Sequence, residues 1–161
     1  MGTVAPGMAA PLFTLLDTRG EVRSLAEALR RGPVLVVFFK IHCPTSRQLF
    51  PYLERLHRAY ADTTAQVWGV ALDPADAVRA FAERYQITFP LLSDYDAYAV
   101  SRAYDPAATP TLVLIEPGGQ IAYVADGFRT AGLNTIAVRL GAFAGRPPTL
   151  VAPDAGGPPA R

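Results

Sequence analysis

The sequence predicts an α/β fold in which helices flank a central mixed β-sheet, with an N-terminal β-hairpin extension. Three observations support this prediction. Apolar segments at 34–39, 66–72 and 111–116 have the composition of strands that are covered on both faces. Segments with helical spacing separate them, and such alternation places helices on both faces of a sheet. A Pro-Gly-Gly turn joins the third segment to 121–126, which predicts an antiparallel pair.

A hairpin and a short helix are predicted at the start of the chain. Apolar residues alternate in the segment APLFTLLDTRGEVRSL, on either side of a turn at Gly20. A helix is predicted after Ser24, because its hydroxyl can accept the N–H of Glu27 and the Glu27 side chain can reach back to the N–H of Ser24. Gly32, followed by proline, is expected to end this helix.

The segment after the first buried strand is predicted to be a helix from Pro44 to about Tyr60. Its apolar residues fall on one face at spacings of four, three and four: Leu49, Leu53, Leu56 and Tyr60. Pro44 is compatible with the first turn, where its missing N–H would have no partner within the helix. Pro51 lies inside the segment and is expected to remove one backbone hydrogen bond and kink the helix.

Another helix and two short elements follow the second buried strand. Asp73-Pro74 is expected to open the helix. Spacing predicts that its inner face carries Val78, Phe81 and Tyr85. Residues 89–92 are predicted to form a short strand, and residues 96–104 a short helix.

The last predicted helix closes the domain. It extends from about Thr130 to Phe143, and its inward residues are expected to be Leu133, Ile136, Leu140 and Phe143. We see no internal repeat and no earlier boundary, so residues 1–144 are predicted to form one domain. Residues 145–161 are rich in proline and glycine and lack periodicity, so we expect a flexible tail.

Charge and composition exclude several kinds of partner. The chain has 161 residues, a formal net charge of +1 and no basic cluster, so nucleic acid is not an expected partner. No apolar run approaches the roughly 20 residues that span a bilayer, and the N-terminus lacks the pattern of a signal peptide. We therefore expect no membrane partner and a cytoplasmic location. A leader removed beforehand would instead make the protein periplasmic or membrane-tethered.

The candidate nucleophile is Cys43, the only cysteine, which excludes an intramolecular disulfide and a multi-cysteine metal site. An ordinary thiol with a pKa of about 8.5 is only about 3% ionised at neutral pH, whereas the N–H groups of a helix N-terminus favour the anion. Lys40 and His42 could add positive potential. A buried, unreactive cysteine is the alternative interpretation, but a strand end at the carboxyl edge of the sheet favours a site.

A second feature, Thr109-Pro110, directly precedes an apolar strand. Proline can begin such a strand but cannot lie within it. An X-Pro bond can be cis, although the general rate is only about 5%. The residues alone therefore indicate a turn proline.

Together these segments resemble the thioredoxin-fold redoxins of the TlpA/ResA-like group, within the broader AhpC/TSA and redoxin superfamily. The resemblance covers roughly residues 4–143. It rests on the leading hairpin, the segment VLVVFFKIHCPTS, Pro51 eight residues after the cysteine, and the segment ATPTLVLIEPGGQI followed by the last helix. It implies a thioredoxin-like fold and a redox-active centre.

The resemblance also implies roles for individual residues. Cys43 matches the attacking cysteine of the family, and Ser46 falls where C-P-x-C proteins have the resolving cysteine. The intervening pair, Pro44 and Thr45, matches residues that tune the redox potential. The resemblance further implies that Pro110 is a cis proline facing the active site and that Thr109, which precedes it, offers backbone groups to a bound peptide or thiol.

Three departures from the family pattern limit the chemistry. The C-P-T-S loop has no resolver, because the hydroxyl of Ser46 cannot exchange with sulfur. Val37, six residues before the cysteine, is apolar where thioredoxins have a buried carboxylate that assists proton transfer. His42 replaces a frequent tryptophan.

These residues favour a thiol–disulfide oxidoreductase-like protein with one thiol. Cys43 would form a mixed disulfide with a protein or with a glutathione-like thiol, and an external reductant would resolve it. Ser46 could donate a hydrogen bond to the thiolate, which favours ionisation. Ser46 is either the natural residue or an engineered replacement of a second cysteine. No cofactor is expected, and no metal site, because His42 and His57 are fifteen residues apart with one cysteine nearby.

Two other functions remain open. A non-catalytic, chaperone-like module could hold an extended peptide beside Pro110 by backbone pairing. A one-cysteine peroxidase could reduce peroxide through a sulfenic acid. Against the peroxidase, Val36 and Lys40 occupy the proline and Thr/Ser positions of the motif P-x-x-x-[ST]-x-x-C. Thr109-Pro110 also stands where a peroxiredoxin has an arginine.

Overall fold

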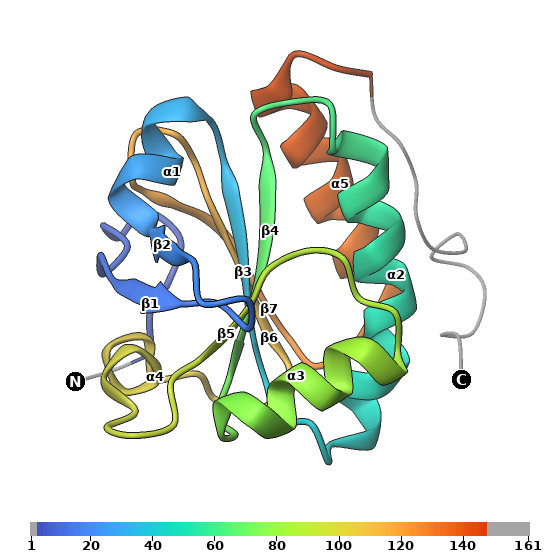
Figure 1. Cartoon of the computed structure of the whole chain (residues 1–161). Coiled ribbons are helices and arrows are strands. Elements are labelled where there is room, and N and C mark those ends of the chain that lie inside the picture. The colour runs from blue at the N-terminus through green and yellow to red at the C-terminus, as the bar shows by residue number, and fades with distance from the viewer. Residues whose placement is uncertain (1–2, 148–161) are drawn as a thin grey trace.

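The centre of the protein is a mixed five-stranded β-sheet. The computed structural model describes residues 3–147 (Figure 1). The strands lie in the order β5-β4-β3-β6-β7, with β3 in the middle. Their bounds are β3 (Val34–Phe39), β4 (Gln66–Ala71), β5 (Leu91–Ser93), β6 (Thr111–Ile115) and β7 (Ile121–Asp126). β3, β4 and β5 are parallel, so their carboxyl ends share one edge, whereas β6 and β7 run antiparallel to their neighbours.

The predicted N-terminal hairpin and short helix are both confirmed. β1 (Thr14–Leu16) pairs antiparallel with β2 (Val22–Ser24), and α1 (Leu25–Arg31) follows. Gly20 takes a φ of +81° in the turn, a conformation that glycine adopts without a Cβ clash. The Ser24 hydroxyl accepts the N–H of Glu27 at 3.3 Å and caps the helix. The helix ends at Gly32, as predicted.

Helices cover both faces of the sheet, which confirms the predicted architecture. α2 (Pro44–Tyr60), α3 (Ala75–Arg84) and α5 (Thr130–Ala144) lie on one face. α1 and α4 (Ala99–Tyr104) lie on the other face together with the β1–β2 hairpin (Figure 1). Because β3 has helices above and below it, all six of its side chains are buried, as its apolar run predicts.

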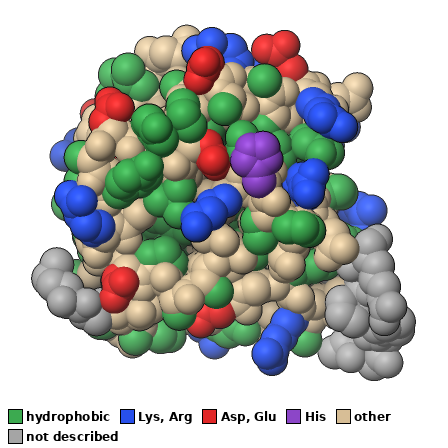
Figure 2. Space-filling model, turned by 90° about the horizontal axis from the view of Figure 1, so that it is seen from below, with side chains coloured by type: hydrophobic (Ala, Val, Ile, Leu, Met, Phe, Trp, Pro, Cys, Tyr) green, Lys and Arg blue, Asp and Glu red, His purple; other side chains and the backbone are tan. Residues whose placement is uncertain are grey.

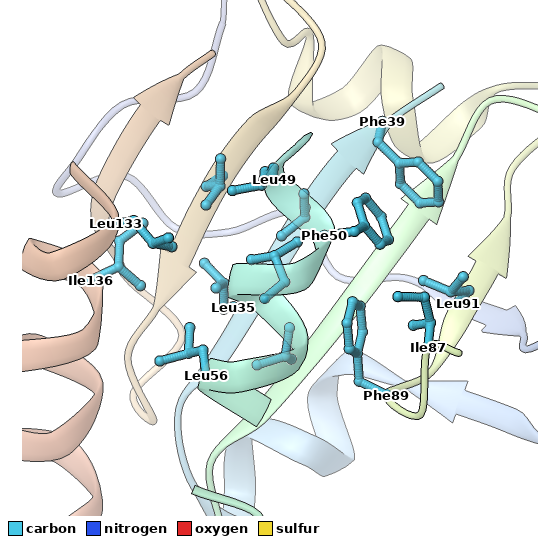
Figure 3. Close-up of a cluster of buried hydrophobic side chains, with 14 of the residues drawn as sticks. Leu35, Phe39, Leu49, Phe50, Leu56, Ile87, Phe89, Leu91, Leu133 and Ile136 are labelled. Atoms are coloured by element: carbon cyan, nitrogen blue, oxygen red, sulfur yellow. The ribbon is translucent and has the colours of Figure 1, made fainter. Parts of the chain in front are cut away.

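The core on the α2 side places the start of that helix against the sheet. Phe50 of α2 contacts Phe39 of β3 with ring centroids 4.6 Å apart, and it stacks on Phe89 at 5.8 Å (Figure 3). The predicted inner face of α2 is buried in the same cluster: Leu49, Leu53, Leu56 and Tyr60. Burying one such side chain contributes roughly 1.5–3 kcal/mol to stability. This packing fixes the end of α2 that follows Cys43.

The structure corrects four details of the helix predictions. Tyr85 and Phe143 were expected to face inward, but they are 37% and 38% exposed. Tyr85 lies beyond the last residue of α3, where helical spacing no longer applies, and Phe143 is in the last turn of α5. Asp73 does not cap α3, because Pro74 occupies the N-cap position. In addition, α4 begins at Ala99, three residues later than the predicted range.

The start of the predicted tail is anchored to the domain. The Arg146 guanidinium forms an ion pair with Asp62, with N···O distances of 2.6 and 2.7 Å, and donates to the carbonyl of Ala59 at 2.9 Å. The rest of the predicted tail, residues 148–161, lies outside the described residues. Within residues 3–147, no helix combines the length and the apolar character needed to cross a bilayer.

Candidate active site

Cys43 lies at the carboxyl edge of the sheet, as predicted, where β3 gives way to α2. Its N–H donates to the carbonyl of Lys40 at 3.1 Å and closes a turn, and its own carbonyl accepts the N–H of Arg47 at 3.1 Å. Cys43 is therefore the N-cap residue of α2, followed by Pro44 in the first turn. Figure 2 looks onto this end of the molecule, where apolar, cationic and anionic side chains are interspersed.

The Thr109-Pro110 segment meets Cys43 across the sheet. The Cys43 thiol donates to the carbonyl oxygen of Thr109 at 3.5 Å, although the two residues are 66 positions apart. The Thr109-Pro110 peptide bond is cis, as the resemblance implied and as the residues alone could not decide. Pro110 is buried, and its carbonyl accepts the N–H of Gly127 at 2.7 Å. The structure thus brings together the two features that the sequence singled out.

Ser46 is completely buried in the first turn of α2, at 0% exposure. Its hydroxyl has no hydrogen-bond partner within the described part of the chain. A buried hydroxyl without a partner costs stability, because it has given up hydration without a replacement. In the neutral state the Cys43 sulfur uses its proton on Thr109. An ionised sulfur is instead an acceptor, and the Ser46 hydroxyl is then available as its donor.

The surroundings of Cys43 favour its ionised form. Partial burial raises the pKa of the Cys43 thiol, but four hydrogen-bonding groups together outweigh this effect, so the pKa lies below its usual value. These groups are the hydroxyl and backbone N–H of Ser46, the Thr109 hydroxyl and the N–H of Thr45. The N–H groups of Thr45 and Ser46 belong to the first turn of α2, where N–H groups have no partner within the helix. Cys43 remains partly exposed and open to a reactant.

The remaining predicted site residues surround the sulfur less closely. Thr45 is half-buried, whereas Pro44 and His42 are exposed. Lys40 is exposed too, and neither Lys40 nor His42 is among the groups that lower the pKa of Cys43.

Three further observations bear on proton transfer and metal binding. Val37 is fully buried in β3 at the position where thioredoxins have a carboxylate, so this position offers no proton acceptor. His57 is half-buried against Phe89, and burial lowers its pKa. Within residues 3–147, His, Cys, Asp and Glu side chains form no group of three that could hold a metal ion.

One residue that sequence reasoning did not assign to the site contacts the loop before Cys43. The Asp73 carboxylate accepts the backbone N–H of Ile41 at 2.9 Å. Asp73 follows β4, and its sequence neighbour Pro74 suggested only a helix start. The available signal was its position, because an acidic residue after a parallel strand lies at the same sheet edge as Cys43.

Comparisons with known proteins relate the chain to thiol–disulfide proteins. The model of the AhpC/TSA family matches residues 6–124. Thiol-disulfide oxidoreductase ResA from Geobacillus kaustophilus is 30% identical over 128 residues, which cover 79% of this chain and 72% of the relative. A crystal structure of the thioredoxin domain of a thiol-disulfide oxidoreductase from Bacteroides vulgatus matches with a TM-score of 0.75 at 26% identity, covering 86% of this chain and 99% of that one. The fold is therefore thioredoxin-like.

A shorter similarity points to a different activity. Chloroplastic peroxiredoxin Q from Triticum aestivum is 32% identical over 94 residues. These residues cover 58% of this chain and 43% of that protein.

Proposed function

This chain belongs to the AhpC/TSA family, and from that premise we propose that it carries out thiol–disulfide exchange through a single nucleophile, Cys43. The substrate is a disulfide of a protein or of a low-molecular-weight, glutathione-like thiol. One observation carries the proposal. The only cysteine of the chain lies at the N-terminus of α2, with its sulfur against Thr109 and its pKa held below the usual value.

The reaction has two steps that balance without a cofactor. First, the Cys43 thiolate attacks one sulfur of the substrate disulfide, so that one S–S bond forms, the substrate S–S bond breaks, and the other substrate sulfur leaves as a thiolate. That thiolate takes a proton from water. In the second step an external thiolate attacks the sulfur bonded to Cys43. Cys43 leaves as a thiolate and the substrate leaves joined to the external thiol.

Ser46 is consistent with a reaction in which Cys43 performs the first step and an external thiol the second. A cysteine at its position would attack the mixed disulfide from within the chain, but a hydroxyl does not exchange with sulfur. The lifetime of the mixed disulfide is then set by the supply of an external thiol. The Ser46 hydroxyl instead favours the thiolate, both as the attacking group in the first step and as the leaving group in the second.

A one-cysteine peroxidase is the second candidate, favoured by the similarity to peroxiredoxin Q. Two observations weigh against it. The exposed Lys40 stands where the peroxiredoxin motif has a threonine or serine. The carbonyl of Thr109, rather than an arginine, faces the sulfur. Thiol exchange needs neither of these missing groups.

Intact mass spectrometry tests the proposal directly. The protein is incubated with glutathione disulfide or with a peptide disulfide at pH 7, and then with dithiothreitol. We expect one adduct per chain, located at Cys43, which the added thiol removes. Cys43→Ser is the control and forms no adduct. Fast consumption of hydrogen peroxide, with slow reaction toward both disulfides, would assign the peroxidase function instead.

Ser46→Cys provides a second comparison for the same proposal. With a resolving sulfur in the chain, release of the substrate no longer requires an external thiol. We expect this variant to form an intramolecular disulfide with Cys43 and to accelerate reduction of insulin disulfides by dithiothreitol. An inert Ser46→Cys protein that folds normally would contradict the assignment of this loop to thiol exchange.

A further inference from the structure

The turn that carries Cys43 is held from outside by Asp73. β3 ends at Phe39, and the Cys43 N–H bonds the carbonyl of Lys40 to form a turn whose second residue is Ile41. A turn of this kind bonds its first and fourth residues and leaves the N–H of the second without a partner inside the turn. The Asp73 carboxylate takes that N–H at 2.9 Å, across 32 positions of sequence.

Both partners of this hydrogen bond are themselves fixed. The side chain of Ile41 is packed against the core on the α2 side of the sheet. The backbone carbonyl of Asp73 accepts the hydroxyl of Ser93 at 2.6 Å. Because Ser93 ends β5 and Asp73 follows β4, the two bonds link the carboxyl ends of the three parallel strands. The two bonds therefore hold the 40–43 turn in a fixed position relative to the edge of the sheet.

We propose that Asp73 is a positioning residue for the chemistry of Cys43: its carboxylate holds the 40–43 turn so that the sulfur stays against the first turn of α2 and Thr109. The inference rests on the proposed function, because it concerns the reactivity of the same thiol. Asp73 touches neither the sulfur nor a substrate in this role. It acts through the N–H of Ile41 and through the geometry of the turn.

The charge and the hydrogen bond of Asp73 have opposite expected effects on the thiol. A negative charge opposes ionisation by repulsion, although Asp73 is not among the groups that shift the pKa of Cys43, whereas the position that its hydrogen bond enforces favours ionisation through the helix N–H groups. Asp73→Asn removes the charge and keeps an oxygen that can accept the N–H of Ile41. Asp73→Ala removes both. The two variants therefore separate positioning from electrostatics.

The test is the pH profile of alkylation of Cys43 by iodoacetamide. In Asp73→Ala we expect the midpoint to move upward by about one pH unit, which is about tenfold less thiolate at pH 7. In Asp73→Asn we expect a midpoint that is unchanged or lower. Asp76→Ala is the matched control, since it removes an exposed carboxylate of α3 that accepts the N–H of Ala77. We expect its profile to equal that of the unchanged protein.

Each other outcome overturns the inference. Equal midpoints in Asp73→Ala and the unchanged protein would show that the turn needs no support from Asp73. A downward movement in both Asp73 variants would assign Asp73 a purely electrostatic effect. If Asp73→Ala does not fold, Ser93→Ala takes its place, because it loosens Asp73 by removing the 2.6 Å bond. Its midpoint must then rise, and a midpoint that stays in place contradicts the inference.

The failure of this inference is distinguishable from failure of the proposed function. An alkylation midpoint of about 8.5 in the unchanged protein contradicts both the proposed function and the role of Asp73, because no activated thiol is then present to be positioned. A low midpoint that persists in Asp73→Ala contradicts only the role of Asp73. The mixed disulfide with glutathione would still form in that case.

Discussion

Replacing Ser46 with alanine separates the reactivity of Cys43 from the stability of the fold. The Ser46 hydroxyl is fully buried without a hydrogen-bond partner in the described structure, and it lowers the pKa of the Cys43 thiol. A hydrogen bond to a charged group contributes about 1.5–3 kcal/mol. Because Cys43 is partly exposed, we take the lower end, which corresponds to about one pKa unit. Ser46→Ala is then expected to lower the thiolate fraction at pH 7 about tenfold.

The same substitution should not destabilise the protein. Removing a buried hydroxyl that lacks a partner removes its desolvation cost, which is about 1–3 kcal/mol on protein mutational scales. The small cavity left by one oxygen offsets part of this gain. We expect the free energy of unfolding, measured with urea, to stay constant or to rise by about 1 kcal/mol. Lower reactivity combined with unchanged or higher stability is the signature of this account.

Ser101 provides a matched control for Ser46→Ala. Its hydroxyl is likewise buried without a partner in the described structure, but it belongs to α4 on the other face of the sheet. Ser101→Ala should therefore have a similar effect on unfolding and none on the alkylation profile of Cys43. Equal profiles for Ser46→Ala, Ser101→Ala and the unchanged protein would refute the role of the Ser46 hydroxyl.

Three further predictions concern the stability of the fold, through substitutions of Glu54 and of two glycines in α5. Glu54→Ala should lower the free energy of unfolding by about 1–3 kcal/mol in urea titrations, because the buried Glu54 carboxylate accepts the N–H of Thr88 at 2.9 Å. Burial raises the pKa of Glu54, but Thr88 and other donors outweigh this and keep it low. The contribution of Glu54 to the free energy of unfolding is therefore full above about pH 4.5 and is lost as the pH falls through its folded-state pKa. Urea titrations at decreasing pH should then show the stabilities of the unchanged protein and of Glu54→Ala converging. In α5, Gly132→Ala should raise the melting temperature, since its Cβ would lie 3.6 Å from the nearest atom and alanine favours the helix by about 1 kcal/mol. Gly141→Ala should lower it, because its Cβ would lie 2.7 Å from the Tyr60 hydroxyl oxygen.

Local patterns predicted most of the fold. The apolar run of β3 and the spacing of apolar residues in α2 predicted both elements with the bounds that the structure shows. These patterns are reliable because each is imposed by burial against the same sheet. Prediction was wrong for Tyr85 and Phe143, at the ends of helices. The spacing of apolar residues continues to Tyr85, which lies beyond the end of α3, and to Phe143, which lies in the last turn of α5.

The site was only partly predictable. Strand end, helix start and Pro44 located Cys43 correctly, and the family resemblance implied the cis peptide bond before Pro110. The bonds from Asp73 to Ile41 and from Glu54 to Thr88 join residues more than 30 positions apart. No local pattern encodes such a contact, because an acidic residue at a strand end or on a helix equally suits a solvated surface.

The rate at which Cys43 reacts with glutathione disulfide, in the folded protein and in the same protein in concentrated urea at pH 7, shows whether the fold activates the thiol. The lowered pKa of the Cys43 thiol increases the thiolate fraction, and the weaker nucleophilicity of a less basic thiolate offsets only part of this gain. We therefore predict a higher rate constant in the folded state than in the unfolded chain. A folded protein that reacts more slowly than the unfolded chain would show a shielded, unreactive cysteine and would contradict the account.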